Sequence, residues 1–171
     1  MKCYFQVENI EGKRHLGQVT SDLFYINSES YLMVLQISFH ENDIGLFATL
    51  VPGDFDDSLQ WPFSYHFELS IVDPSPSGHD RKGSVDPTVG TCPVAAFTKP
   101  KYQPNVPCGF RKFTTFPMLE AKHLKRNGNI LVKFSAVLDK MPSYAKLSMK
   151  NNFLVAEYNW RVTNIERKVS I

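Results

Sequence analysis

Hydrophobic and polar residues alternate with a period of two along three segments of the chain. In residues 31–39, Gln36 and Ser38 stand between apolar residues at the odd positions, which are Tyr31, Met33, Leu35, Ile37 and Phe39. The same alternation occurs in residues 67–71 and 130–136. Because successive side chains of a strand point to opposite faces, this pattern predicts three strands that each bury one side.

Shorter apolar runs, separated by turn-forming segments such as PGDFDD and DPSPSGHD, predict further strands at 4–10, 22–26, 45–51, 113–116 and 153–165. The best helix candidate is MLEAKHLKRNG, residues 118–128, with cations in its last turn and Gly128 placed to end it. One short helix among about eight strands indicates an all-β fold, an antiparallel β-sandwich with an extra C-terminal strand.

Residues 75–107 are rich in proline and hold few apolar runs. Proline has no backbone N–H for a sheet ladder, so this stretch cannot be an interior strand throughout. We expect an ordered loop over one end of the sandwich, with a short edge strand at 94–98. Such loops often carry binding residues, although a solvated linker without a role is the alternative.

Trp61, Pro62 and Phe63 follow an acidic turn and precede the strand predicted at 67–71. Proline ends one element there, and the two large rings can bury much apolar surface. We therefore expect Trp61 and Phe63 to pack in the core.

The run around this corner, LFATLVPGDFDDSLQWPFSYHFELSIVDP, resembles the centre of a TRAF-C domain, the β-sandwich of the tumour-necrosis-factor-receptor-associated factors within the wider MATH group. The preceding SDLFYINSESYLMVLQISF and the later AFTKPKYQPNVPCGFRKFTTFPMLEA and NGNILVKFSAVL are similar to the flanking strands, loop and helix of that family. The resemblance covers about residues 4–138 and implies a TRAF/MATH-like sandwich.

This resemblance implies a protein-binding adaptor that captures an extended peptide, such as a receptor tail, along the edge of the sandwich in receptor or ubiquitin-linked signalling. Strand addition supplies main-chain hydrogen bonds, and pockets for alternate side chains supply specificity. Phe47 and Phe113 match aromatic positions of the family's groove, and Gly109 matches a position of close approach to the peptide. By packing alone, the two rings could equally be core and Gly109 a turn glycine.

The chain departs from the family at several polar positions. Gln36 and Ser38 stand where many members carry an arginine and a tyrosine that contact the peptide, and Val94, Ala95 and Ala96 replace three serines. A cluster of cations lies near the same edge in the resemblance, namely Lys99, Lys101, Arg111 and Lys112. We therefore expect an acidic peptide bound near Gln36, Ser38, Arg111 and Lys112, with an affinity that falls as salt rises.

Composition narrows the possible partners and the location. The net charge of +2 and the pI of about 8.4 lack the concentrated positive charge that nucleic-acid binding needs. The sequence shows no signal-peptide core and no apolar stretch long enough for a membrane span. The three cysteines, Cys3, Cys92 and Cys108, show no zinc spacing and predict buried free thiols rather than a disulfide. These features predict a cytoplasmic domain without membrane insertion.

No enzyme motif stands out. The five histidines lack metal-binding spacing, no nucleophile elbow or phosphate loop is found, and Cys108 has no motif that pairs it with a histidine. Asp54, Asp56 and Asp57 lie in a predicted turn without the spacing of a calcium loop. We expect a binding domain that has no catalytic residues, metal or cofactor.

The C-terminal region gives the alternative function. Residues 1–142 form the expected sandwich and 143–171 an extension with one more strand. YNWRVTNIERK in the extension and CYFQVENIEGK near the N-terminus both resemble the opening strand of a MATH domain. The second copy could be an added edge strand, which we favour, a truncated repeat, or a strand exchanged with another molecule. We expect a monomer or weak oligomer; the alternative to peptide capture is an assembly module that acts through this strand.

Overall fold

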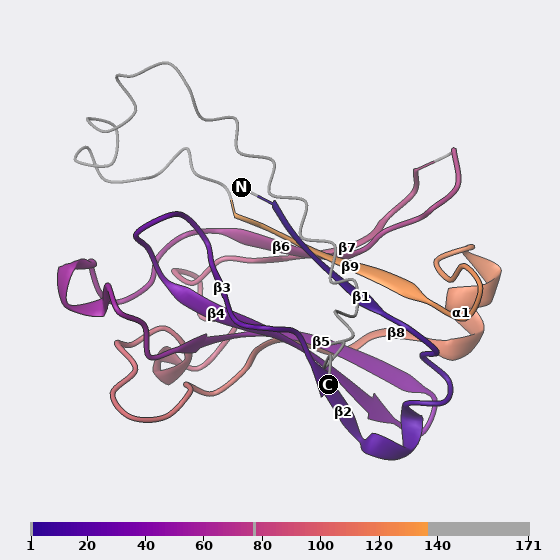
Figure 1. Cartoon of the computed structure of the whole chain (residues 1–171), viewed down its shortest axis with the longest axis horizontal. Coiled ribbons are helices and arrows are strands. Elements are labelled where there is room, and N and C mark those ends of the chain that lie inside the picture. Colours follow the sequence, from indigo (N-terminus) through magenta and orange to yellow (C-terminus); the bar gives the residue numbers. More distant parts are fainter. Residues whose placement is uncertain (1, 77, 137–171) are drawn as a thin grey trace, which may run out of the picture.

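The computed structural model describes residues 2–76 and 78–136. Two antiparallel sheets face each other (Figure 1). The first sheet has the order β1 (Lys2–Val7), β9 (Ile130–Ala136), β6 (Phe67–Ile71) and β7 (Arg81–Val85). The second has the order β2 (Gln18–Thr20), β4 (Leu32–His40), β5 (Asp43–Val51) and β8 (Cys108–Thr115), with β3 (Phe24–Tyr25) also paired to β4. The predicted antiparallel sandwich is confirmed.

The core lies between the sheets and is built from the alternating residues of the sequence. In the first sheet, Leu69, Val132 and Phe134 have no exposed surface. Leu35 of β4 and Leu46 of β5 face them from the second sheet and are equally buried. Burial of this apolar surface, at roughly 25 cal/mol per Å², is the main force that closes the sandwich.

Aromatic rings fill one end of the core. Phe63 is fully buried, and Tyr31 packs edge-on against both Phe63 and Trp61 with ring centroids 5.0 Å apart. Trp61 is half-buried against the core, and its Nε1 donates to the carbonyl oxygen of Asp56 at 2.9 Å. The prediction that Trp61 and Phe63 serve packing is confirmed.

Two strands and one turn differ from the sequence prediction. β2 and β7 were not predicted, because each is short and carries a single apolar residue, Val19 or Val85. The edge strand predicted at 94–98 is wrong, since Val94–Ala96 forms the 3-10 helix η3. Ala96 and Phe97 turn into the core there, and the ring of Phe97 stacks on that of Phe63.

The helix α1 (Phe116–Ala121) begins earlier and ends earlier than predicted. Thr115 caps it by accepting a hydrogen bond from the backbone of Met118, and Pro117 fits the first turn, where its missing N–H is harmless. Gly128 does not end this helix. With Asn127 it forms a two-residue turn at positive φ, closed by hydrogen bonds between Arg126 and Asn129.

The pairing of the cysteines departs furthest from the sequence prediction. Cys92 and Cys108 form a disulfide with a Cα separation of 5.7 Å, so the prediction of three free thiols was wrong. Only the fold brings the proline-rich loop to the start of β8. Cys3 is a free thiol, and burial raises its pKa to about 11 despite an opposing backbone hydrogen bond from Tyr4. Disulfides are rare in reducing compartments, so the cysteines no longer support a cytoplasmic location.

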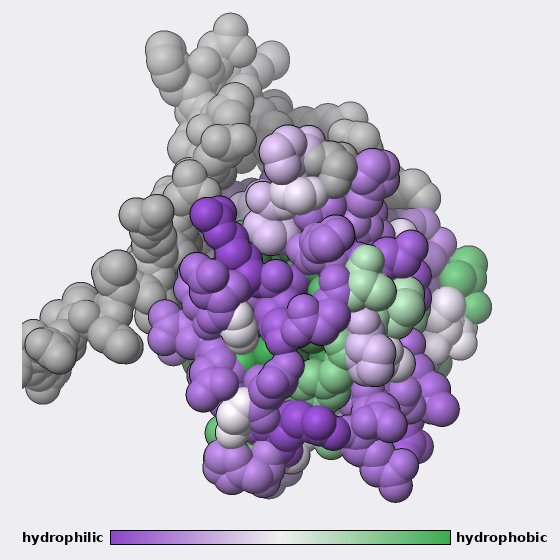
Figure 2. Space-filling view, turned by 90° about the vertical axis from the view of Figure 1, so that its right-hand side faces the viewer, coloured by the Kyte–Doolittle hydropathy of each residue, from purple (hydrophilic) through white to green (hydrophobic). Residues whose placement is uncertain are grey.

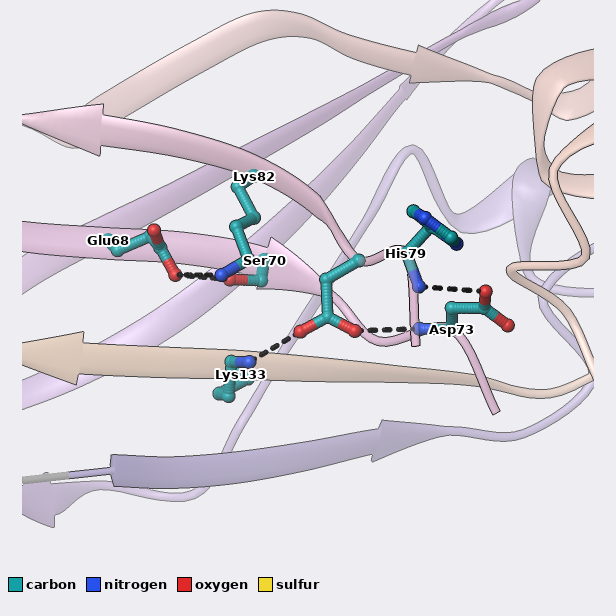
Figure 3. A network of polar contacts seen from close by, with 7 residues as sticks. Glu68, Ser70, Asp73, His79, Lys82 and Lys133 are labelled. Atoms are coloured by element: carbon teal, nitrogen blue, oxygen red, sulfur yellow. Dashed lines mark hydrogen bonds and ion pairs between the residues drawn. The ribbon is translucent and has the colours of Figure 1, made fainter. Parts of the chain in front are cut away.

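A polar network covers the outer face of the first sheet (Figure 3). Lys133 of β9 donates to Asp80 at 2.5 Å, and the other oxygen of Asp80 accepts from the backbone of Asp73 at 3.0 Å. Lys82 of β7 lies 3.6 Å from Glu68 of β6. The network ties the turn between β6 and β7 to the neighbouring strand β9.

The predicted strand at 153–165 and the boundary between 142 and 143 lie outside the described residues. Among the helices of the part that is described, none is long and apolar enough to cross a membrane.

Candidate functional site

The terminal strand β8 and the outer face of the second sheet form the candidate site. Among the described strands, β8 pairs with β5 alone in this sheet, so its other edge has no strand beside it. Gln36 lies directly opposite Phe47, and Phe47 directly opposite Gly109. The structure therefore brings three of the sequence-predicted residues into one row that runs across β4 and β5 to the edge strand, each of them partly exposed.

Gly109 is required by the neighbouring strand. A Cβ atom at this position would lie 2.2 Å from the carbonyl oxygen of Leu46 and 2.7 Å from the Cα of Phe47. No side chain fits at such distances without a shift of the backbone. Close packing within the sheet therefore requires glycine at position 109. Because this glycine has no side chain, it also leaves Phe47 uncovered on the side of β8.

Ser38 lies beside this row and is mostly covered. It stands opposite Gly45, and a Cβ on Gly45 would lie 2.4 Å from Ser38 Oγ and 2.8 Å from the ring of Phe47. The ring therefore lies over Gly45 and next to the Ser38 hydroxyl. Ser38 is 6% exposed, and its Oγ has no hydrogen-bond partner within the described residues.

Phe113 does not join the row. It is 2% exposed and packs inward against Phe110, with ring centroids 5.7 Å apart. A bulge is the reason: residues 111–113 face the single residue Gly45 between the paired positions on either side. Regular alternation from Phe110 would turn residue 113 outward, but the extra residues in β8 turn it into the core.

Arg81 of β7 closes one end of the free edge. Its Nε donates to the carbonyl oxygen of Phe113 at 3.0 Å, and its guanidinium carbon lies 5.5 Å from the centre of the Phe113 ring. An added strand would thus find open backbone at residues 108–112 rather than along the whole of β8. The sequence carried no signal for this role of Arg81.

Arg111 and Lys112 line a groove at the turn between β4 and β5. The groove has a volume of about 530 Å³, and its other lining residues are Phe39, His40, Glu41 and Asp43. Lys112 Nζ lies 3.3 Å from Asp43 Oδ2, whereas Arg111 is exposed and has no ion pair in the part of the chain that the structure covers. Phe39 also stacks on Phe116 of α1, so the groove lies beside that helix. Figure 2 views the end of the molecule that carries α1, where a hydrophobic strip shows between hydrophilic surroundings.

The other sequence-predicted cations lie apart from this groove. Lys99 forms an ion pair with Asp57, and Lys101 is an exposed loop residue. At the predicted serine-replacing positions, Val94 is 75% exposed, whereas Ala96 is buried. Of the four clustered cations, the structure brings only Arg111 and Lys112 to the groove.

Asp43 was missed by the sequence reasoning. It pairs with Thr115 across the sheet and adds a carboxylate to the lining of the groove, next to Lys112. Its position one residue after Asn42, at the start of an apolar run, was a usable turn signal. It makes the groove mixed in charge rather than purely cationic.

The acidic turn serves structure. Asp56 accepts a hydrogen bond from the backbone of Gly53 at 2.9 Å, and Asp54 accepts one from the hydroxyl of Tyr25 at 3.2 Å. No group of three or more potential metal ligands occurs among the residues described. The turn interpretation of these aspartates therefore fits their hydrogen bonds.

Comparisons with known proteins agree with this architecture. The family model described as TRAF/meprin, MATH domain, matches residues 17–133. A solved structure of Notothenia coriiceps TRAF5 is similar, with a TM-score of 0.73 and 24% sequence identity over 82% of this chain and 75% of that one. Among curated proteins, no sequence matches the chain. Since the family model covers most of the sandwich, the chain belongs to the TRAF/meprin MATH domain family, whose members are protein-interaction domains.

Proposed function

We propose that this domain captures an extended segment of a partner protein by strand addition at residues 108–112 of β8. The observation that carries the proposal is the row from Gln36 through Phe47 to Gly109, which ends at a strand edge that no other described strand occupies. A strand laid on this edge would gain main-chain hydrogen bonds, and its alternate side chains would reach the ring of Phe47.

The side chains around the edge favour a partner with acidic residues. Arg111 is exposed beside the open backbone and has no ion pair within the described residues. Lys112 is 77% exposed and shares its charge with Asp43. Gln36 donates from its amide to Gln18 at 3.1 Å, so it offers a polar contact rather than a charge. Acidic positions of the partner would therefore lie near Arg111, and an apolar one near Phe47.

A receptor tail or signalling protein as the partner and a link to ubiquitin signalling stay predictions from the family resemblance. The cytoplasmic location stays a prediction from the sequence, and the Cys92–Cys108 disulfide removes the support that the cysteines gave it. The assembly role expected for the C-terminal strand also stays a prediction, because that strand lies outside the described residues.

The test uses peptides selected from a random display library against the full chain, then measured by titration calorimetry. We expect Phe47→Ala to weaken binding about tenfold, the equivalent of about 1.4 kcal/mol for one lost anchor contact. Arg111→Glu should weaken acidic peptides further and reduce the dependence of their affinity on salt.

Lys101→Glu is the matched control, because it reverses an exposed charge that does not line the groove. It should bind the peptides as the wild type does. Wild-type affinity in both Phe47→Ala and Arg111→Glu would show that partners bind elsewhere, and affinity independent of salt would remove the acidic preference.

A further inference from the structure

The N-terminal strand β1 occupies a position in the first sheet that we call the β1 seat, which is the place alongside β9 from Ser135 to Ile130. Within the described residues β1 pairs only with β9, in an antiparallel register from Lys2 opposite Ser135 to Val7 opposite Ile130. Val7 and Ile10 fill the inner side of the seat, with 1% and 0% of their surface exposed. The chain then turns against the loop at 125–129.

Polar residues fix this turn. Asn9 adopts a positive φ of 47°, which asparagine tolerates better than most residues, and its backbone N–H donates to Asn129 Oδ1 at 3.0 Å. Asn9 Oδ1 accepts from the backbone of Gly12 at 3.2 Å. Glu11 accepts from Lys125 at 2.6 Å, an ion pair that lowers the pKa of Glu11. The seat thus selects for valine, asparagine, isoleucine and glutamate at fixed spacing.

The same residues recur at the same spacing near the other end of the chain. Residues 3–13 read CYFQVENIEGK and residues 158–168 read YNWRVTNIERK. The identical positions include every one of these four seat residues, which have their counterparts in Val162, Asn164, Ile165 and Glu166. Trp160 also keeps an aromatic ring at the place of Phe5.

One difference between the two copies has to be accommodated in the seat. Arg167 stands in place of Gly12, where a Cβ would lie 2.4 Å from the side-chain nitrogen of Asn9. The Cβ would also lie 2.8 Å from Cγ and 2.9 Å from Oδ1 of Asn9, so the asparagine side chain would have to move as a whole to another rotamer. The backbone itself poses no obstacle, because Gly12 has no positive φ.

The position of the repeat in the chain also suits the seat. β9 ends at Ala136, next to the point where the seat begins at Ser135. A segment that returns after residues 137–157 would run antiparallel to β9, in the same direction as β1. Loop closure adds little cost at this length, because that cost rises only with the logarithm of loop length.

We infer that residues 158–168 are a second copy of the opening segment and fill the β1 seat of their own molecule whenever β1 leaves it. Two strands of one chain then compete for one position. The sandwich therefore stays closed when β1 is released.

The test places charges in each copy of the full chain. Val7→Asp with Ile10→Asp should expel β1, because a buried unpaired carboxylate is costly. We expect this double variant to retain a cooperative unfolding transition and to gain slow hydrogen exchange in 158–168. Val162→Asp with Ile165→Asp should unfold like the wild type, because β1 then holds the seat. The variant with all four changes should lack a cooperative transition.

The matched control is Gln6→Asp with Glu8→Asp, two exposed positions of the same segment, which should leave exchange in 158–168 unchanged. Loss of cooperative unfolding in Val7→Asp with Ile10→Asp alone would overturn the inference, as would a four-fold variant that stays folded. Retained folding that depends on protein concentration would overturn the assignment to the same molecule and identify a second copy of the chain as the donor.

Discussion

The outer faces of the two sheets differ in how far they satisfy their own polar groups. On the first sheet, Lys133 and Asp80 pair with side chains that are 14% and 11% exposed, and Ser70 donates to Glu68 at 3.2 Å. Nearly complete pairing of this kind rigidifies a surface and leaves little for a partner to bind.

The second sheet leaves such groups without internal partners. In the described part of the chain, Ser38 Oγ and Thr49 Oγ1 are buried without a hydrogen bond, and Arg111 has no ion pair. The first sheet therefore satisfies its own polar groups, whereas the second leaves groups that a bound segment could reach, as the proposed function requires.

Removal of the disulfide should have the largest effect on stability, because it ties the proline-rich loop to the start of the binding edge. We expect Cys92→Ser to lower the free energy of unfolding by about 3 kcal/mol, as for a disulfide that closes a loop of this length. Urea unfolding under non-reducing conditions measures it. Reduced wild-type protein should match the variant, and an equal stability of oxidised wild type and Cys92→Ser would refute the covalent tie.

Lys133→Met should break the network of the first sheet and cost about 2 kcal/mol, the usual worth of a hydrogen bond to a charged group. Lys82→Met is its control: at 3.6 Å from Glu68 and half-exposed, Lys82 should contribute less than about 1 kcal/mol. Denaturant unfolding at neutral pH compares the two variants. Equal losses in the free energy of unfolding would show that the network contributes no more than an exposed ion pair.

The same lysine should control the acid sensitivity of the fold. Burial acts to raise the pKa of Asp80, but hydrogen bonds from Lys133 and from the backbone of Asp73 outweigh it and hold the pKa below its usual value of 3.8. Asp80 therefore stabilises the fold above that pH, and the contribution is lost as pH falls through the lower folded value. Lys133→Met should flatten this loss below about pH 4, measured by thermal unfolding from pH 2 to 6; an unchanged slope would assign the acid sensitivity to other groups.

The smallest effect on stability should come from Lys112→Ala on the binding side. Its exposed pair with Asp43 is worth less than about 0.5 kcal/mol. Binding should respond more, because the change removes a cation and leaves the carboxylate of Asp43 facing the groove, which repels acidic peptides. Weaker peptide binding at unchanged stability would support the difference between the two sheets, whereas a loss of stability without a change in binding would contradict it.

Much of the fold followed from local pattern. Alternation located β4, β6 and β9, because one face of each strand is buried and the period of two is the direct result. The resemblance around Trp61 and Phe63 added the family, which the comparisons confirmed. The short polar strands β2 and β7 were not predicted, because pairing with neighbouring strands rather than their own residues determines them.

The candidate site was only partly predictable. The row of Gln36, Phe47 and Gly109 was anticipated from the family, but its register is a property of three paired strands. Phe113 was misplaced because a bulge reverses the facing of a residue without leaving a local signal.

The sandwich, its buried aromatic corner and the duplicated opening segment could be read from the amino-acid sequence, because each depends on residue type and spacing along the chain. Three contacts became visible only in the folded chain: Cys92 bonds to Cys108, Arg81 closes one end of the β8 edge, and Lys133 pairs with Asp80. Each of these contacts joins residues 16 to 53 positions apart. Local propensity carries no information about such contacts, since they form only after the sheets have fixed which segments lie side by side.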